Sequence, residues 1–273
     1  LRVEMEAGDG VIKNAWTSTT QYRGIEVIAC KRDPRDVWAF VERICGVCTG
    51  THAIAALAAV EDALQYPVPV QARLMRALGI QEHVIHFYQL QAMDWVDVMS
   101  ALKADPAETA AIAKSLSDWP LSSAAYFAGV QKKLKDSIAY GQYSIFTNGY
   151  WGHPAYKLPP EVNLLGVAHY LQALVWQRDM IKIHTILGGK NPHPNFLVGG
   201  MACAINMNND QAINQFSLSY LKQLVQTCHD FIHKVYYPDI VAIAGFYKDY
   251  AHIGASNPNF FCTGAPSEIN AGA

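Results

Sequence analysis

The chain has 273 residues, 51% of them hydrophobic and 16% charged, so it can bury a sizeable core in one large domain or two ordinary ones and lacks the composition of a disordered protein. Its 21 lysines and arginines nearly balance its 23 aspartates and glutamates, which gives a net charge of -2. No basic block is present that could follow a phosphate backbone, so we expect no nucleic-acid partner.

The first part of the chain predicts a β-hairpin and then a short helix. In residues 1–20, the turn residues Gly8-Asp9-Gly10 separate two runs that contain apolar side chains, which is the pattern of a hairpin. At Asp33-Pro34 the chain offers a good N-cap followed by proline in the first helical position, and apolar residues recur at helical spacing through Ile44. We expect this short helix to lead directly into Cys45.

Residues 33–273 predict a bundle of helices without an internal repeat. Beyond the short helix, we expect helices at 51–65, 71–102, 106–116, 122–140, 160–187 and 210–236, an ordered loop at 148–160 and a loop at 190–200. The helix at 51–65 is apolar on nearly every face, which is typical of a buried helix. The helix at 160–187 begins at Pro159-Pro160 and is ended by Gly188-Gly189. The predicted fold class is mainly α with a small β appendage (α+β).

The apolar runs are short and the cysteines are few. The run Ala53–Val60 is far below the ~20 residues that cross a bilayer, so we expect no transmembrane segment. No basic stretch followed by an apolar one opens the chain, which leaves either a cytosolic protein or one exported with a signal-bearing partner. The six cysteines do not form a disulfide framework, which indicates reduced thiols and metal or redox work where two lie close together. They are residues 30, 45, 48, 203, 228 and 262.

The most informative motif is the run RICGVCTGTH at residues 43–52. Two cysteines three positions apart can direct both thiolates at one soft metal, because a turn brings them to the same side, and we expect Gly46 to permit that turn. Arg43 and the N-terminal end of the following helix can lower the pKa of the thiols. His52 follows Cys48 by one helical turn and can donate a hydrogen bond to a metal-bound sulfur.

Other interpretations of this motif remain open at the level of the residues. A structural zinc knuckle needs two more ligands, and no second CxxC or CxxH pair occurs. A thioredoxin-like redox pair needs a strand before the motif, whereas a helix is predicted there. Plain buried cysteines are the third interpretation. We expect Cys203, Cys228 and Cys262, which stand alone, to be packed thiols.

Residues 43–52 resemble the first cysteine motif of nickel-iron hydrogenase large subunits, and the resemblance extends over nearly all of the chain. The sequence is most similar to those of the membrane-associated uptake hydrogenases. Further blocks that resemble the family are YRGIE (22–26), RDPRD (32–36), HVIHFY (83–88), DWVD (94–97), NGYWGHP (148–154) and GGKNPHP (188–194). The resemblance implies the long-helix bundle of that family and the reversible heterolytic cleavage of H2 to protons and electrons.

The resemblance also implies roles for individual residues. Cys45 corresponds to a terminal nickel ligand, and Cys48 corresponds to a bridge between nickel and an iron that also carries CO and cyanide. Glu26 matches the carboxylate ligand of a magnesium ion, although by itself it could equally be a solvated charge. Glu82 stands where the family has the aspartate of a His-Asp-His sequence, and it would keep a carboxylate near the site.

Partners and location follow from the same resemblance. No cluster-binding cysteine set occurs in this sequence, so electrons would leave through the iron-sulfur clusters of a small partner subunit, and from there through a membrane cytochrome b. The implied location is membrane-associated, on the periplasmic face. Residues 1–273 would form the N-terminal part of one large-subunit domain. The family's second cysteine pair and a proton-accepting glutamate would lie outside this sequence, and the stretch from Pro69 to His83 is several residues short of the family pattern.

Two further hypotheses belong to other classes of protein. A related subunit of the quinone-reducing respiratory complex has the same fold without the metal, but the presence of both Cys45 and Cys48 counts against it. A zinc-stabilised helical module would unfold when the metal is chelated.

Overall fold

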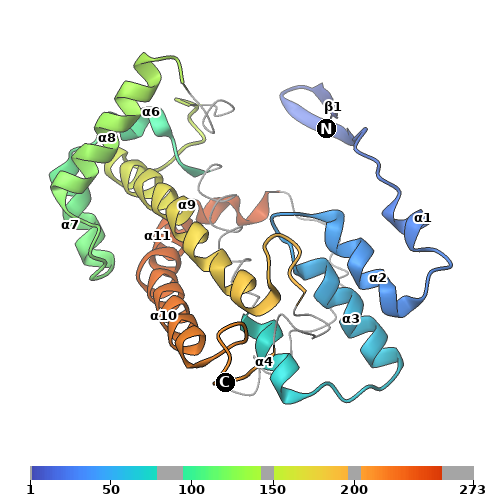
Figure 1. The fold of residues 1–273 in the computed structure, drawn as a ribbon. Helices are drawn as coiled ribbons and strands as arrows, with labels where there is room; N and C mark the ends of the chain where they lie inside the picture. The colour runs from blue at the N-terminus through green and yellow to red at the C-terminus, as the bar shows by residue number, and fades with distance from the viewer. Residues whose placement is uncertain (1, 79–94, 143–150, 196–203, 254–273) are drawn as a thin grey trace.

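The structure is a computed structural model that describes residues 2–78, 95–142, 151–195 and 204–253. It is mainly helical with one two-stranded sheet, as the sequence predicts. In Figure 1 the long helix α9 runs between the N-terminal elements and the pair α7 and α8, with α10 beside it. The elements of this part are β1 (Arg2–Gly8), β2 (Val11–Ser18), α1 (Ile25–Ala29), α2 (Pro34–Val41), a 3-10 helix (Glu42–Ile44), α3 (Thr51–Ala63), α4 (Val70–Leu78), α6 (Val98–Ala101), α7 (Pro106–Leu116), α8 (Ala124–Ala139), α9 (Pro160–Gly188), α10 (Gln215–Phe231), a π-helix (Ile232–Tyr236), α11 (Tyr237–Phe246) and a second 3-10 helix (Lys248–His252).

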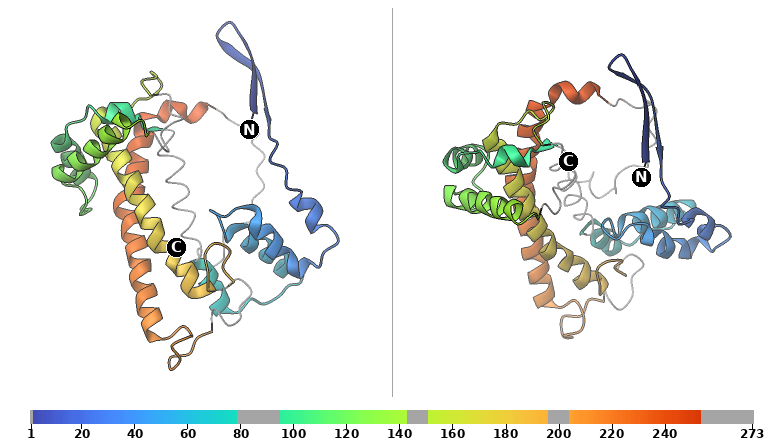
Figure 2. Two further views of the ribbon diagram at one scale, coloured as in Figure 1. Left: turned by 45° about the horizontal axis from the view of Figure 1, so that its top comes forward. Right: turned by 90° about the horizontal axis from the view of Figure 1, so that it is seen from above.

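The strands β1 and β2 form the predicted antiparallel hairpin. Asp9 and Gly10 close it with positive φ angles of 56° and 77°, the backbone of a two-residue type I′ turn that aspartate and glycine both tolerate. Both views in Figure 2 show the hairpin extending away from the helices. The side chains of Met5 and Trp16 are accordingly exposed, so this hairpin adds nothing to the described core.

The helix predicted after Asp33-Pro34 is α2, and its start is confirmed. The Asp33 carboxylate accepts a hydrogen bond from the backbone N–H of Arg35, and Pro34 occupies the first turn, where a missing N–H costs nothing. At Glu42 the α-helix tightens into the 3-10 helix, which ends at Ile44. The chain then becomes extended at Cys45, so this segment delivers the cysteine as predicted.

The burial predicted for the helix at 51–65 is wrong. The helix itself is confirmed as α3, but within it only Ala53 and Leu57 are buried. These two side chains form a stripe that joins a core cluster with α9 and α10, and α2 packs on the same helix. A helix is buried on all sides only where neighbours surround it, and the elements of the described ranges cover one side of α3.

The single helix predicted at 71–102 is also wrong. The structure describes α4 as far as Leu78, and residues 79–94 lie outside the described ranges. Asp97 is extended, and its carboxylate caps the N–H groups of Met99 and Ser100, so a separate short helix, α6, begins after it. The backbone N–H of Asp97 donates to the buried side chain of Asn163 at 2.8 Å instead of to a helical carbonyl. A hydrogen-bond partner far away in the sequence therefore interrupts the helix, although the spacing of apolar residues predicts one continuous helix.

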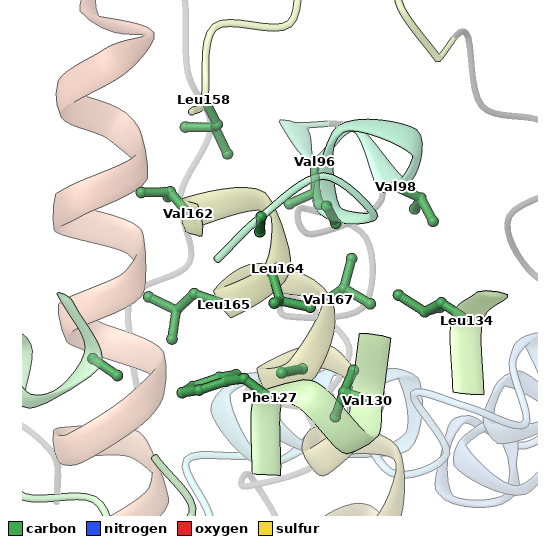
Figure 3. Close-up of a cluster of buried hydrophobic side chains, with 14 of the residues drawn as sticks. Val96, Val98, Phe127, Val130, Leu134, Leu158, Val162, Leu164, Leu165 and Val167 are labelled. Atoms are coloured by element: carbon green, nitrogen blue, oxygen red, sulfur yellow. The ribbon is translucent and has the colours of Figure 1, made fainter. Parts of the chain in front are cut away.

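The long helix α9 connects the two core clusters. The cluster in Figure 3 packs Leu164, Leu165 and Val167 of α9 against Phe127 and Val130 of α8. The helix has 29 residues and ends as predicted, with Gly189 in the left-handed region at φ 77°. No helix within the described ranges is long and apolar enough to cross a membrane.

The second cluster lies where α9 meets α10. The indole of Trp176 stacks on the ring of Phe231, with a distance of 4.8 Å between the ring centroids. The predicted helix at 210–236 differs at both ends: α10 begins after Asn214, whose side chain caps the N–H of Ser217, and the chain remains helical to Phe246. The π-helix lets the chain continue, because it places Pro238 in the first turn of α11, where proline is tolerated.

The predicted loop at 148–160 is ordered over residues 151–159, the part that the structure describes. The N–H of Gly152 donates to the Asp97 carboxylate at 3.0 Å, and the Tyr247 hydroxyl accepts from the N–H of Lys157 at 2.9 Å. The Tyr247 hydroxyl in turn donates to the carbonyl of Trp95 at 2.8 Å. This tyrosine therefore joins the loop to the chain that precedes α6.

A close approach between α9 and Val96 gives a test of this packing. A Cβ at Gly166 would lie 2.9 Å from Val96 Cγ2, which is closer than real Cβ atoms approach a neighbour. Val96 is buried and β-branched, so it cannot turn away at low cost. We expect Gly166→Ala to lower the free energy of unfolding by about 1–3 kcal/mol, the usual cost of overpacking, measured by urea or thermal denaturation of the full-length protein.

Gly129 in α8 is the matched control, because a Cβ there would meet nothing within 4 Å. Gly129→Ala should raise the free energy of unfolding by about 0.5–1 kcal/mol, since alanine loses less chain entropy than glycine in a helix. The pair Gly166→Ala and Val96→Ala should together cost less than the sum of the single changes. Equal free energies of unfolding for Gly166→Ala and Gly129→Ala would contradict the close packing at Val96.

Cys228 of α10 is the packed thiol that the sequence predicts, while Cys203 and Cys262 lie outside the described residues. Burial raises the pKa of Cys228 to about 12, so at pH 8 on the order of 1 molecule in 10,000 carries the reactive thiolate. Iodoacetamide at pH 8 should therefore label the exposed Cys30 and leave Cys228 unmodified until denaturant is added, as peptide mass spectrometry would show. Rapid labelling of Cys228 in the native protein would contradict this burial.

Candidate metal centre

The two cysteines of the motif lie on a turn between the first 3-10 helix and α3. The backbone N–H of Cys48 donates to Cys45 Sγ at 3.2 Å, so the sulfur of the first cysteine points back toward the second. Both thiols are half-buried. The spacing of three residues thus forms the backbone turn that the sequence predicts, and a shared metal stays a prediction.

Gly46 is not required for this turn in the way that the sequence suggested. Its φ is not positive, and a Cβ added there would meet nothing within 4 Å. The prediction that glycine permits the turn was therefore wrong. The turn is closed by the hydrogen bond from the N–H of Cys48 to Cys45 Sγ, and no residue with a left-handed backbone is needed.

His52 lies beside Cys48, as predicted from the helical spacing. Its Nε2 is 3.6 Å from Cys48 Sγ, within range of a hydrogen bond to sulfur, and the ring projects from the first turn of α3. At the start of the same helix, the backbone N–H of Thr51 donates a hydrogen bond to the carbonyl of Cys48 at 3.3 Å. The positive end of the α3 dipole thus lies at Cys48, where it favours a thiolate.

Arg43 belongs to the motif but pairs with its neighbour. Its guanidinium donates to the Glu42 carboxylate at 2.6 Å and to the carbonyl of Ala39 at 2.8 Å. The Glu42 side chain is fully buried, whereas that of Arg43 is about half-exposed. Much of the charge of Arg43 is therefore compensated, and its effect on the thiol pKa stays a prediction.

The structure does not test the roles predicted for the two carboxylates. Glu26 lies in the first turn of α1 with an exposed side chain, and Glu82 lies outside the described residues. No group of three or more His, Cys, Asp or Glu side chains that could hold a metal occurs within the described ranges. The roles of Glu26 and Glu82 stay predictions.

The structure adds three residues that sequence reasoning did not assign to the site. Arg23 donates to the carbonyls of Arg43 and Ile44, directly before Cys45. Thr49, directly after Cys48, forms hydrogen bonds with His193, which lies in the loop that follows α9. Arg23 and His193 belong to blocks noted for their family resemblance, YRGIE and GGKNPHP, but nothing local in the sequence pairs either with the cysteine turn.

Burial, together with the positive charges of Arg43 and Lys190, lowers the pKa of His193. The histidine is therefore biased toward its neutral form beside the cysteine turn. Its backbone has a φ of 61°, in the left-handed region that residues other than glycine rarely adopt.

The donor set fits part of a site for a soft transition metal. Two thiols on one turn are the ligands that nickel, iron and zinc accept from cysteine, and a four-ligand site would need further donors. A hydrogen-bonding imidazole beside one sulfur is the usual support for such a ligand.

Known proteins with similar sequences are hydrogenase subunits. The uptake hydrogenase large subunit of Rhizobium leguminosarum bv. viciae is 53% identical over 263 residues, and the hydrogenase-1 large chain of Escherichia coli (strain K12) is 52% identical over the same length. Each match covers 93% of this chain and 44% of the relative, so the chain spans less than half the length of these relatives.

The fold is similar to that of a solved hydrogenase. The Ni-Fe-Se hydrogenase from D. vulgaris Hildenborough, in its as-isolated oxidized state, matches with a TM-score of 0.65 and 26% identity, over 97% of this chain and 46% of that chain. The family profile described as nickel-dependent hydrogenase matches residues 23–272, which include the cysteine turn, His52 and the loop after α9. The chain belongs to the nickel-dependent hydrogenase family.

Proposed function

We propose that this chain is part of the catalytic large subunit of an uptake-type nickel-iron hydrogenase, which cleaves H2 reversibly to protons and electrons. The observation that carries the proposal is the turn that brings Cys45 and Cys48 together, with His52 at 3.6 Å from the second sulfur. The uptake hydrogenase subunits that are about half identical to this chain support the same activity.

Each residue of the turn has a distinct role in this proposal. Cys45 would be a terminal ligand of nickel, and Cys48 would bridge nickel to an iron that carries CO and cyanide. When bound, this group supplies the site at which dihydrogen is polarised and its electrons are accepted. His52 would donate a hydrogen bond to the Cys48 sulfur and fix its direction, while the N-terminal end of α3 favours the thiolate.

Further parts of the proposal rest on the resemblance to the family. Glu26 would ligate magnesium, and Glu82 would hold a carboxylate near the site. Residues 1–273 would form the N-terminal part of one large-subunit domain, which a second cysteine pair from elsewhere in the protein completes.

The partners are proposals of the same kind. The name "large subunit" of the relatives supports a small partner subunit, whose iron-sulfur clusters would carry the electrons to a membrane cytochrome b. The assembly would be membrane-associated on the periplasmic face. A test of the partner is whether a small subunit copurifies with the full-length protein.

Substituting a ligand tests the proposed function directly. Cys48→Ser replaces a soft sulfur by a hard oxygen, so we expect the purified full-length protein to lose nickel and all H2 uptake. In the unsubstituted large subunit, separated from its iron-sulfur partner, metal analysis should find nickel and iron in equal amounts, and infrared spectra should show bands of CO and cyanide.

Cys30→Ser is the matched control, since Cys30 is an exposed thiol outside the turn. It should retain both metals and full H2 uptake. Zinc as the sole metal of the unsubstituted protein, or unchanged H2 uptake in Cys48→Ser, would contradict the proposed function.

Removing the imidazole beside Cys48 tests the role of His52. We expect His52→Ala to retain nickel and iron but to lower kcat for H2 oxidation by about 10–100-fold, the usual loss when a hydrogen-bonding partner of a metal ligand is removed. His229→Ala, an exposed histidine of α10, should leave kcat unchanged. A full kcat in the metal-loaded His52→Ala protein would show that the contact with Cys48 has no part in turnover.

A further inference from the structure

We propose that Arg23 and His193 are positioning residues that hold the turn from Cys45 to Cys48 at both of its ends. The inference rests on the proposed function where it concerns turnover, whereas the contacts themselves are independent of it. Neither residue touches a thiol in the contacts described above, so each would act through the backbone or through Thr49.

Arg23 holds the end that precedes Cys45. Its guanidinium donates from Nη1 to the carbonyl of Arg43 at 2.8 Å and from Nη2 to the carbonyl of Ile44. These carbonyls belong to the end of the 3-10 helix, where main-chain acceptors lack helical partners and where a cation is favoured. A planar guanidinium can reach two adjacent carbonyls at once, which a lysine ammonium does less well.

His193 holds the end that follows Cys48. The hydroxyl of Thr49 accepts from the backbone N–H of His193 and lies 3.0 Å from its Nδ1. Thr49 is 2% exposed, so this double contact is protected from water. A buried hydroxyl that loses its partners is costly, which favours the one arrangement in which both contacts are made.

The loop that carries His193 is itself anchored to α9. The N–H of Asn195 donates to the carbonyl of Gly188 at 3.1 Å, and the Asn191 side chain lies 3.1 Å from Nδ1 of the buried His184. The left-handed backbone of His193 persists where its surroundings determine it. Through His193, which is 144 positions from Thr49 in sequence, the contact therefore connects the cysteine turn to the loop that is anchored on α9.

Holding both ends narrows the directions that the two sulfurs can take. The turn is short and half-buried, and the contact that closes it, from the Cys48 N–H to Cys45 Sγ, fixes the Cys45 sulfur relative to the backbone of Cys48. Arg23 and His193 fix the turn relative to the rest of the protein. Metal sites require ligand positions within about 0.5 Å of the productive geometry, which such supporting contacts provide.

Four single variants of the full-length protein, and one double variant, test the inference. Thr49→Val removes the hydroxyl and keeps the shape of the side chain, whereas Thr49→Ser keeps the hydroxyl. Arg23→Lys keeps the charge and loses the planar fork. Arg35→Lys is the matched control, because Arg35 is an exposed arginine of α2 that pairs with Asp33.

The first readout is the infrared spectrum of the metal-loaded enzyme. We expect the CO and cyanide bands to shift in Thr49→Val and Arg23→Lys, with kcat lowered by roughly tenfold, and to stay unchanged in Thr49→Ser and Arg35→Lys. A residue that only stabilises the fold would reduce the yield of loaded enzyme without moving the bands. The double variant Thr49→Val with His193→Ala should shift the bands no further than Thr49→Val alone, since losing the Thr49 hydroxyl already removes both contacts with His193.

The second readout needs no metal. In the metal-free full-length subunit, iodoacetamide should label Cys45 and Cys48 several-fold faster in Thr49→Val and Arg23→Lys than in the other two variants, because the turn is released. Arg23 is exposed, so Arg23→Lys keeps the test valid even if Thr49→Val fails to fold.

The outcomes separate the two levels of the proposal. If the unsubstituted protein contains no nickel, the proposed function fails, and the labelling rates still judge the positioning role. If the bands and the labelling rates of Thr49→Val and Arg23→Lys both equal those of Arg35→Lys, the positioning role is overturned.

Discussion

Two cysteine sulfurs can share a metal only if the backbone between them turns back on itself, and the candidate metal centre depends on that turn. The 3-10 helix brings the chain to Cys45 in an extended conformation, and the N–H of Cys48 closes the turn on its sulfur. The start of α3 then places His52 beside Cys48. The order α2, 3-10 helix, turn and α3 is thus a local construction, contained within residues 34–63.

A local construction still has to be oriented, and the long helix α9 provides the link. One half of α9 packs on α8 around Phe127, and the other half packs on α10 around Phe231. Because both core clusters share α9, the loop that follows Gly189 starts from a fixed point. That loop carries His193 to Thr49, so packing that lies far from the cysteines determines where their turn is held.

The features that sequence predicts well are those with local causes. Asp33-Pro34 begins α2, and Gly189 ends α9, because caps and left-handed residues act within one turn of a helix. The cysteine pair and His52 also depend on spacing alone. The break at Asp97 and the Thr49 contact could not be predicted, because their partners are 66 and 144 residues away. The burial of α3 failed for a related reason, since an apolar sequence does not say which neighbours exist.

Charge explains why orientation is the main contribution of this chain to the site. Two like unit charges repel by roughly 4 kcal/mol at about 4 Å and an effective dielectric constant of about 20, whereas a helix N-terminus returns about 0.3–1 kcal/mol. Arg43 is paired with the buried Glu42, so its charge is already engaged. In the proposed site, the positive charge of the metal would therefore supply most of the compensation. What remains for the protein is the direction of the sulfurs, and the contacts made by His52, Arg23 and Thr49 all act on direction.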